Sequence, residues 1–321
     1  RTGVIERGHD VTILAPRPRD LEDVDTTGMI LLGSGTDFKS PTHTTSHFSV
    51  SVDSDAIDQI LEQEQFDVLH FHEPWVPVLS RQILSRSQAV NIATFHGALP
   101  ETLMSQTIIK VVTPYSQSIL KYIDEFTAVS PAAAQYISSL TDEPIKLIPN
   151  GIDLTRYTWT DRPEPSEAPM ILYVGRLEKR KGVNFLLQAF RILQRRLPGA
   201  RLVIAGDGPD REKLELLTED LQLQNVDFKG FVSDAEKMEL LATCDLFCSP
   251  AIYGESFGLV LLEAMASGAP VVAGNNSGYT GVLQDIGQIS LVNPQDPEDF
   301  ARRMHVLLTE PKLRKLWLTW A

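Results

Sequence analysis

The stretch GESFGLVLLEAMASG, residues 254–268, combines two carboxylates with an otherwise small and apolar sequence. Seven residues separate the first acid, Glu255, from the second, Glu263. The pattern predicts a helix that begins near Ser256 or Phe257 and ends at the closing glycine, a common C-terminal stop. Because this helix is apolar nearly all round, we expect it to be buried. A buried carboxylate is costly unless it is paired, so the two acids require an explanation.

The composition sets the class of protein around this stretch. A chain of 321 residues predicts two domains, and 43% hydrophobic with 22% charged residues is typical of a globular enzyme. A net charge of −13 argues against binding to nucleic acid or to anionic lipid in general. No run reaches about 18 apolar residues, and no signal peptide is visible. We therefore expect a cytoplasmic protein with at most peripheral contact at the inner membrane face.

The two cysteines suggest no special chemistry. Cys244 and Cys248 match neither a zinc pattern nor a disulfide framework. We expect both to be inert buried thiols.

Short β-branched runs alternate with amphipathic helical stretches along the first half of the chain. A helix end at Val4–Arg7 precedes a strand at Asp10–Ala15, so the first strand of this sheet is expected to be missing. Further strand-like runs follow, each bounded by turn residues: 66–72, 91–97, 125–130 and 145–151. This alternation predicts βαβ units in a mostly parallel sheet, over residues 1–153.

A polar, proline-rich stretch, residues 154–169, then predicts a linker. Beyond it a second βα series begins and continues to the end, over residues 170–321. Its predicted strands lie at 169–177, 200–206, 225–232, 245–250, 269–274 and 287–292, and its last helix runs from Pro297 to Leu308. The fold class is α/β, with two doubly wound, Rossmann-like domains facing across a cleft. Ligands in such sheets bind at the carboxyl ends of the strands.

The loop GRLEKRKG, residues 175–182, follows the first strand of the second series. A helix N-terminus favours an anion, and cations beside it add direct pairing. We therefore expect Arg176 and Lys181 to bind phosphate, whereas Lys179 and Arg180 are interpreted as solvated.

A second loop, GDGPDR at residues 206–211, begins like a dinucleotide fingerprint. Its third glycine is replaced by Arg211, which makes a nicotinamide-dependent oxidoreductase a weak alternative. For Gly206 and Gly208, a tight strand-to-helix turn and contact with a ligand both remain open.

The spacing of the two glutamates suits one extended ligand. In a continuous helix, Glu263 lies about 12 Å beyond Glu255, at 1.5 Å per residue. Each carboxylate could accept from hydroxyl groups on a different part of the ligand, while the free amides of Ser256 to Leu259 face the same helix mouth. Alone, each acid could equally be a helix-terminal or a satisfied core acid. The neighbouring phosphate loop favours binding.

Several motifs together resemble a known family. The E-x7-E pattern in residues 254–273, with GRLEKRKG, GDGP and PNGID, resembles the retaining family 4 glycosyltransferases of GT-B fold. In the first half, FDVLHFHEP and NIATFHG are similar to the phosphatidylinositol mannosyltransferase subgroup. The family's glycine-rich loop after its first strand and its last, crossing helix are absent, so we expect a chain truncated at both ends.

The resemblance implies a nucleotide-sugar donor, most simply GDP-mannose, held mainly by the C-terminal domain. Glu255 would bind donor-sugar hydroxyls and Glu263 the ribose, while Arg176 and Lys181 would neutralise the diphosphate and His96 would reach the sugar. The remaining implied donor contacts are Gly175, Gly206, Asp207, Gly208, Ser256, Phe257, Gly258 and Leu259.

The family further implies transfer with retention to a hydroxyl of a lipid-linked, polyol or glycan acceptor. Neither a cofactor nor a metal is expected, and His70 and His72 are interpreted as structural or acceptor-lining. Two alternatives stay open: a UDP-sugar donor, and a catalytically silent protein that binds a nucleotide or glycan.

Overall fold

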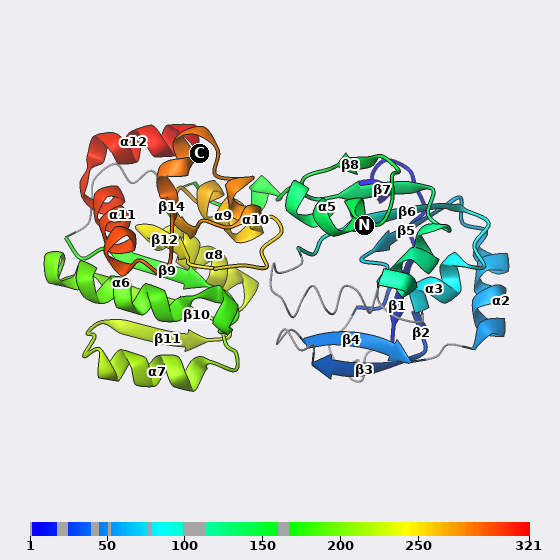
Figure 1. The fold of residues 1–321 in the computed structure, drawn as a ribbon, viewed down its shortest axis with the longest axis horizontal. Helices are drawn as coiled ribbons and strands as arrows, with labels where there is room; N and C mark the ends of the chain where they lie inside the picture. The colour runs from blue at the N-terminus through cyan, green and yellow to red at the C-terminus, as the bar shows by residue number, and fades with distance from the viewer. Residues whose placement is uncertain are drawn as a thin grey trace. The chain divides into compact units, whose positions relative to one another are not determined.

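The computed structural model describes residues 2–17, 25–39, 45–50, 53–75, 79–98, 113–159 and 167–321. These residues form two compact units (Figure 1). Most of the first half of the chain makes up one unit, and the other contains Leu147–Ala321 with the short segments His96–Glu101 and Ala128–Tyr136.

A six-stranded parallel sheet organises the C-terminal unit. Its strands are β9 (Met170–Val174), β10 (Arg201–Ala205), β11 (Val226–Gly230), β12 (Leu246–Ser249), β13 (Val271–Gly274) and β14 (Leu291–Val292). Their spatial order is β11-β10-β9-β12-β13-β14. The chain therefore leaves β9 in one direction and, after β11, returns to the other side of β9, which makes the β9/β12 edge a topological switch point.

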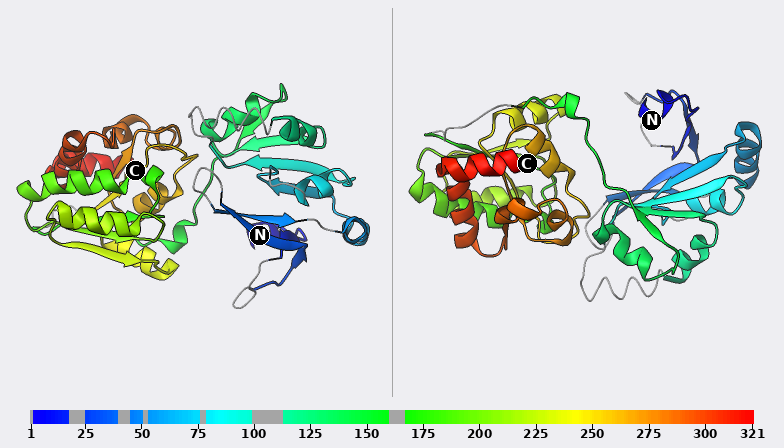
Figure 2. Two further views of the ribbon diagram at one scale, coloured as in Figure 1. Left: turned by 60° about the horizontal axis from the view of Figure 1, so that its bottom comes forward. Right: turned by 90° about the horizontal axis from the view of Figure 1, so that it is seen from above.

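Helices lie on both sides of this sheet (Figure 2). They are α6 (Val183–Arg196), α7 (Arg211–Asp220), α8 (Asp234–Thr243), α9 (Leu259–Ala266), α10 (Ser277–Thr280), α11 (Pro297–Thr309) and α12 (Pro311–Trp320). Apolar residues of α6 recur at helical spacing and are buried, as in Leu186, Phe190 and Leu193. Helix α6 packs against α11 and α7, and α8 packs against α9.

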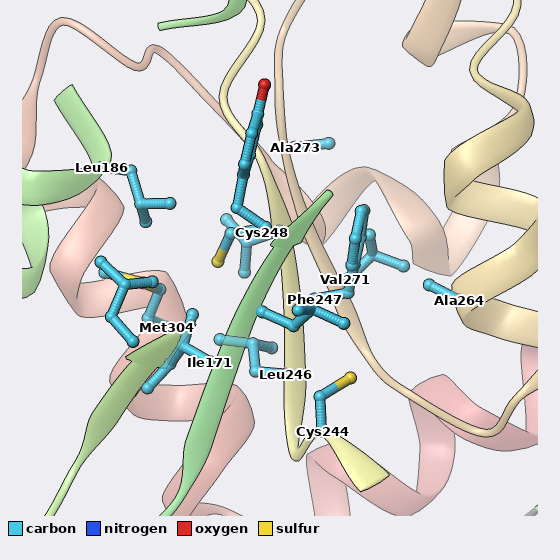
Figure 3. Close-up of a cluster of buried hydrophobic side chains, with 14 of the residues drawn as sticks. Ile171, Leu186, Cys244, Leu246, Phe247, Cys248, Ala264, Val271, Ala273 and Met304 are labelled. Atoms are coloured by element: carbon cyan, nitrogen blue, oxygen red, sulfur yellow. The ribbon is translucent and has the colours of Figure 1, made fainter. Parts of the chain in front are cut away.

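The centre of the C-terminal core lies around β12, all four residues of which are buried. Neighbouring side chains alternate between the faces: Phe247 points toward Ala264 of α9, and Cys248 lies on the side of Leu186 of α6 (Figure 3). A strand that is covered on both faces has a continuous apolar sequence, as β12 has. Both cysteines are buried and free, as predicted, and burial raises the pKa of the Cys248 thiol.

Among the described residues of the N-terminal half of the chain, the strands form three separate sheets. A four-stranded sheet has the order β5 (Val68–His72), β6 (Val90–Phe95), β7 (Glu125–Ala128) and β8 (Ile145–Leu147). Parallel strands β1 (Ile13–Pro16) and β2 (Met29–Leu32) form a second sheet, and antiparallel strands β3 (Ser34–Lys39) and β4 (Thr45–Val50) a third. The helices in this half of the chain include α1 (Thr2–Ile5), α2 (Ser54–Glu64), α3 (Leu79–Leu84) and α5 (Pro131–Ser138).

Several boundaries differ from the sequence predictions. The predicted first strand at Asp10–Ala15 begins later, because β1 starts at Ile13 and pairs there with Met29. The run 287–292 is mostly the 3-10 helix η3 (Asp285–Ser290), which leaves only two residues for β14. Strands β2, β3 and β4 and helices α10 and α12 are additional to the predicted elements.

The predicted linker, residues 154–169, is only partly described. It opens with the 3-10 helix η1 (Leu154–Arg156), whose N-cap Asp153 accepts from the amide of Thr155. Residues 160–166 of the predicted linker lie outside the described residues. In the described part of the chain, no helix has the length and apolar character needed to cross a membrane.

Candidate functional site

Two loops meet at the switch point of the C-terminal sheet. The loop after β9 contains the basic segment with the 3-10 helix η2 (Lys179–Lys181), and the loop after β12 contains Glu255. The backbone joins them, since the amide of Ile252 donates to the carbonyl of Arg180 at 2.9 Å. This is the edge at which doubly wound sheets bind their ligands.

Glu255 is the centre of a charged cluster between these loops. Its Oε1 accepts from Lys181 Nζ at 2.7 Å and from Arg180 Nη1 at 2.8 Å. The three side chains are 12%, 17% and 20% exposed, for Glu255, Lys181 and Arg180. The two cations therefore compensate the burial of this carboxylate, and together the cluster carries net positive charge.

A second acid extends the cluster on the β9 side. The carboxylate of Glu178 is 2% exposed and lies between two guanidinium groups. Arg180 Nε donates to its Oε2 at 3.1 Å, and Arg176 Nε lies 3.0 Å from its Oε1. Arg176 is 49% exposed, so one side of its guanidinium group faces solvent.

Two buried tyrosines respond to the charge of Glu255. Burial raises the pKa of Tyr173, and so does the negative charge of Glu255. The same two causes, in the same order, raise the pKa of Tyr279 well above its usual value. Tyr173 donates to the carbonyl of Arg176, whereas Tyr279 pairs with the Ser249 hydroxyl and has a hydrogen bond with Glu255 that raises its pKa further. The wall of the cluster is thus protonated and uncharged at neutral pH.

The expected start of the glutamate helix is wrong. Helix α9 begins at Leu259, so Glu255 lies in the preceding loop and the expected separation of about 12 Å along one helix does not hold. The reason is a pair of left-handed glycines, Gly254 with φ 74° and Gly258 with φ 100°, which turn the chain before the helix can start. The expected burial of this helix does not extend to its first residue, Leu259, which is 42% exposed.

The loop that replaces the first helical turn carries three amides that could serve a ligand. The N–H groups of Ser256, Phe257 and Gly258 form no backbone hydrogen bond within the described residues. They lie between the Glu255 cluster and the start of α9 in the sequence. A loop of such amides ahead of a helix is suited to an anion or a sugar oxygen.

Glu263 is held by a different set of partners. Its Oε1 accepts from Lys237 Nζ of α8 at 3.0 Å and from Tyr157 Oη at 3.0 Å. Burial, followed by the hydrogen bond to Glu263, raises the pKa of Tyr157 to about 12. Lys237 also lies 3.8 Å from Asp234, which in turn pairs with Arg156 at 3.2 Å.

The glycine loop after β10 packs directly against the loop after β9. A Cβ atom at Gly206 would overlap the carbonyl oxygen of Gly175, so close backbone approach alone requires glycine there. Gly208 likewise lies against the backbone of Leu177. Asp207 is exposed and accepts from the amide of Gly208 at 2.7 Å. The tight-turn interpretation therefore explains both glycines without a ligand.

The histidines belong to the N-terminal strands. His96 directly follows β6 and is half-buried. His70 Nε2 lies 2.6 Å from Thr94 Oγ1, and the His70 and His72 rings are 4.5 Å apart. No three His, Cys, Asp or Glu side chains gather as metal ligands among the residues that the structure describes.

Sequence reasoning missed four members of these clusters: Glu178, Arg180, Tyr157 and Lys237. Arg180 is not solvated, because Glu178 and Glu255 lie on either side of its guanidinium group. Lys179 is exposed, as predicted. The single acid that precedes three bases in LEKRKG was a usable signal for Glu178, whereas nothing in the local sequence links Lys237 to Glu263.

Known families match both halves of the chain. The description "Glycosyltransferase Family 4" matches residues 2–156, and "Glycosyl transferases group 1" matches residues 160–318. A solved structure with the same fold is that of Anabaena Alr3699/HepE in complex with UDP and glucose. It superposes with a TM-score of 0.69 at 21% identity, covering 83% of this chain and 74% of the other.

Two relatives extend the comparison across both domains. "Phosphatidyl-myo-inositol mannosyltransferase" of Mycolicibacterium smegmatis is 34% identical over 259 residues, which is 79% of this chain and 65% of the relative. The protein of the same name in Mycobacterium leprae is 32% identical over 321 residues, which is 97% of this chain and 82% of the relative. The match thus spans just under two thirds of the first relative.

Proposed function

Since the chain belongs to the family 4, group 1 glycosyltransferases with the GT-B fold, we propose that it transfers a hexose from a nucleotide-sugar donor to an acceptor hydroxyl. The donor is GDP-mannose and the acceptor is phosphatidyl-myo-inositol or a closely related inositol lipid. The names of the two relatives support mannose and the lipid. Residues 170–321 hold the donor and residues 1–153 the acceptor.

The observation that carries this proposal is the Glu255 cluster at the switch point. Lys181 and Arg180 give the site positive charge, and Glu255 gives it one hydrogen-bond acceptor for hydroxyl groups. A nucleotide sugar has the complementary sequence of groups, a diphosphate followed by a sugar. Glu263 and its partners supply a further acceptor for the ribose hydroxyls.

Transfer separates charge, and the site is arranged to stabilise that separation. As the bond between the anomeric carbon and phosphate oxygen breaks, the sugar becomes positive and the diphosphate gains negative charge. Arg176, Lys181 and the amides of residues 256–258 stabilise the diphosphate electrostatically. These protein cations can neutralise the leaving group, which supports a mechanism without a metal ion.

The anomeric configuration is retained. The acceptor oxygen bonds to the anomeric carbon on the face from which the diphosphate leaves, and the acceptor proton passes to a phosphate oxygen. No protein nucleophile is then required. Glu255 is a binding residue, in contrast to the nucleophile of a retaining hydrolase. His96 contacts the donor sugar from the end of β6.

A lipid acceptor places the reaction at a membrane surface. Peripheral contact is sufficient for this, because only the inositol headgroup must enter the site. The net charge of −13 argues against general electrostatic attraction to anionic lipid, so the headgroup itself must contribute to recognition.

The test is transfer from radiolabelled donors to lipid. The full chain is incubated with GDP-mannose or UDP-glucose and vesicles that contain phosphatidylinositol, and label in the lipid extract is counted. We expect label from GDP-mannose, and loss of most of it in Glu255→Gln. Transfer of label from UDP-glucose but not from GDP-mannose would agree with the family and contradict GDP-mannose as the donor. Nucleotide binding without transfer or donor hydrolysis would favour the catalytically silent alternative.

A further inference from the structure

Arg180 is tied to both loops at the switch point. Its Nε donates to Glu178 Oε2 at 3.1 Å, within its own loop. Its Nη1 donates to Glu255 Oε1 at 2.8 Å and to the carbonyl of Gly254 at 3.3 Å, both in the loop after β12. A planar guanidinium group can serve two carboxylates at fixed angles, which an ammonium group on a flexible stem does not.

Lys181 competes with Arg180 for the same oxygen of Glu255. Both cations donate to Oε1. Lys181 has no second carboxylate partner among the described residues, whereas Arg180 keeps Glu178. An arriving diphosphate can therefore draw Lys181 away at little cost, while Arg180 remains held between the two acids. Glu178 reinforces this, because its carboxylate is 2% exposed and would be costly to leave unpaired.

We propose that Arg180 is a positioning residue for the donor sugar: anchored by Glu178, it orients Glu255 toward the sugar hydroxyls while Lys181 moves to the diphosphate. This inference rests on the proposed function. It separates two tasks within one basic segment, since Lys181 acts on the phosphates and Arg180 acts through Glu255. The segment thus links the arrival of the diphosphate to the loss of one of the two cationic donors on Glu255 Oε1.

The expected signature is a selective loss of sugar recognition. In Arg180→Lys the side chain can no longer span Glu178 and Glu255, so the orientation of Glu255 is lost. GDP lacks the sugar, and we expect its affinity to stay within about twofold of wild type. For GDP-mannose we expect kcat/KM to fall about 10- to 100-fold, the range for one charge-assisted hydrogen bond. A purely structural defect would weaken both ligands alike.

The experiment measures GDP and GDP-mannose affinity by calorimetry, and steady-state transfer, for wild type, Arg180→Lys, Glu178→Gln and Lys179→Ala. Lys179→Ala is the matched control, because it removes an exposed charge one residue away. Glu178→Gln preserves an acceptor for Arg180 and should show a smaller loss of the same kind. It also provides the test if Arg180→Lys fails to fold.

Three results would overturn the inference: unchanged GDP-mannose kinetics in Arg180→Lys, an equal loss for GDP and GDP-mannose, or an equal effect of Lys179→Ala. The same series with UDP and UDP-glucose keeps the test valid if the donor base differs. If wild-type protein binds neither nucleotide, the proposed function fails, and this inference fails with it. Normal wild-type transfer with an unaffected Arg180→Lys variant rejects only the role of Arg180.

Discussion

Tyr157 donates a hydrogen bond of 3.0 Å to Glu263, 106 residues further along the chain. The same oxygen, Oε1, also accepts from Lys237 of α8. One carboxylate oxygen thus joins α9, α8 and the segment that follows η1. The second acid of the sequence pattern is therefore not a plain core acid, and a ribose bound there as proposed would have to share or displace its partners.

The raised pKa of Tyr157 predicts a specific loss of stability in alkali. In the folded state this pKa is about 12, against 10.0 ordinarily, because of burial and the hydrogen bond to Glu263. The folded protein then binds the proton more tightly, so the contribution is complete below pH 10 and is lost as the pH rises from 10 toward 12. Wild type should lose more stability across this window than Tyr157→Phe, as measured by urea titration at each pH.

The difference between wild type and Tyr157→Phe in the slope of unfolding free energy against pH isolates the contribution of the Tyr157 phenol. Tyr173 and Tyr279 are present in both proteins, so their contributions cancel in the difference. Tyr253→Phe, which changes an exposed tyrosine, is the control and should keep the wild-type slope. Parallel curves for wild type and Tyr157→Phe would show that the hydrogen bond to Glu263 does not shift the phenol.

Lys181→Met is predicted to abolish most of the activity while the fold survives. In the proposed reaction this substitution removes a cation from the leaving diphosphate, an effect that typically lowers kcat by about 10²–10³-fold. Glu255 keeps Arg180 as its partner, so no unpaired acid is created. Transfer from GDP-mannose is the measurement, with Lys179→Met as the exposed control. A Lys181→Met enzyme with the wild-type rate would remove this lysine from the site.

Gly182→Ala is predicted to destabilise the C-terminal unit. Gly182 has φ 68°, a left-handed conformation that costs other residues about 1–2 kcal/mol. An added Cβ would also overlap the carbonyl oxygen of Pro250, in the loop that carries Glu255. We expect a loss of at least about 1 kcal/mol in urea unfolding, and weaker binding of GDP because the two loops are forced apart.

Gly281→Ala provides the matched control. This glycine has φ −70°, and an added Cβ would lie 3.5 Å from its nearest neighbour, the carbonyl oxygen of Gly278. Its effect on unfolding should stay within about 0.5 kcal/mol. Equal unfolding free energies for Gly182→Ala and Gly281→Ala would mean that the loop at Gly182 accommodates a Cβ atom without loss of stability.

Trp317→Ala should unfold more easily than wild type by about 3–5 kcal/mol, the range for a large buried side chain. Trp317 of α12 is fully buried, and α12 packs against α11 and η3. Leu316→Ala, at a neighbouring position that is 51% exposed, should change stability by no more than about 0.5 kcal/mol. Far-UV circular dichroism in urea distinguishes them. Two similar curves would show that α12 contributes little to the core.

Local periodicity was enough to predict most of the C-terminal sheet. The strand runs at 169–177, 200–206 and 225–232 contain β9, β10 and β11, and the predicted last helix covers α11 almost entirely. An apolar run bounded by turn residues depends on the conformation of only a few neighbouring residues, so each such strand or helix can be predicted separately. The two glycines that delay α9 were visible in the sequence, but their left-handed conformations were not.

By itself, the sequence determined the parallel α/β class, the basic loop after the first C-terminal strand and the presence of two acids near the next switch-point strand. Only the tertiary structure decided which charges meet. Arg180 and Glu255 are 75 residues apart, and they meet because β9 and β12 are neighbours in the sheet although three α-helices and two strands separate these strands in the chain. Ion pairing depends on distance in space, and that distance follows from strand order, which no local pattern encodes.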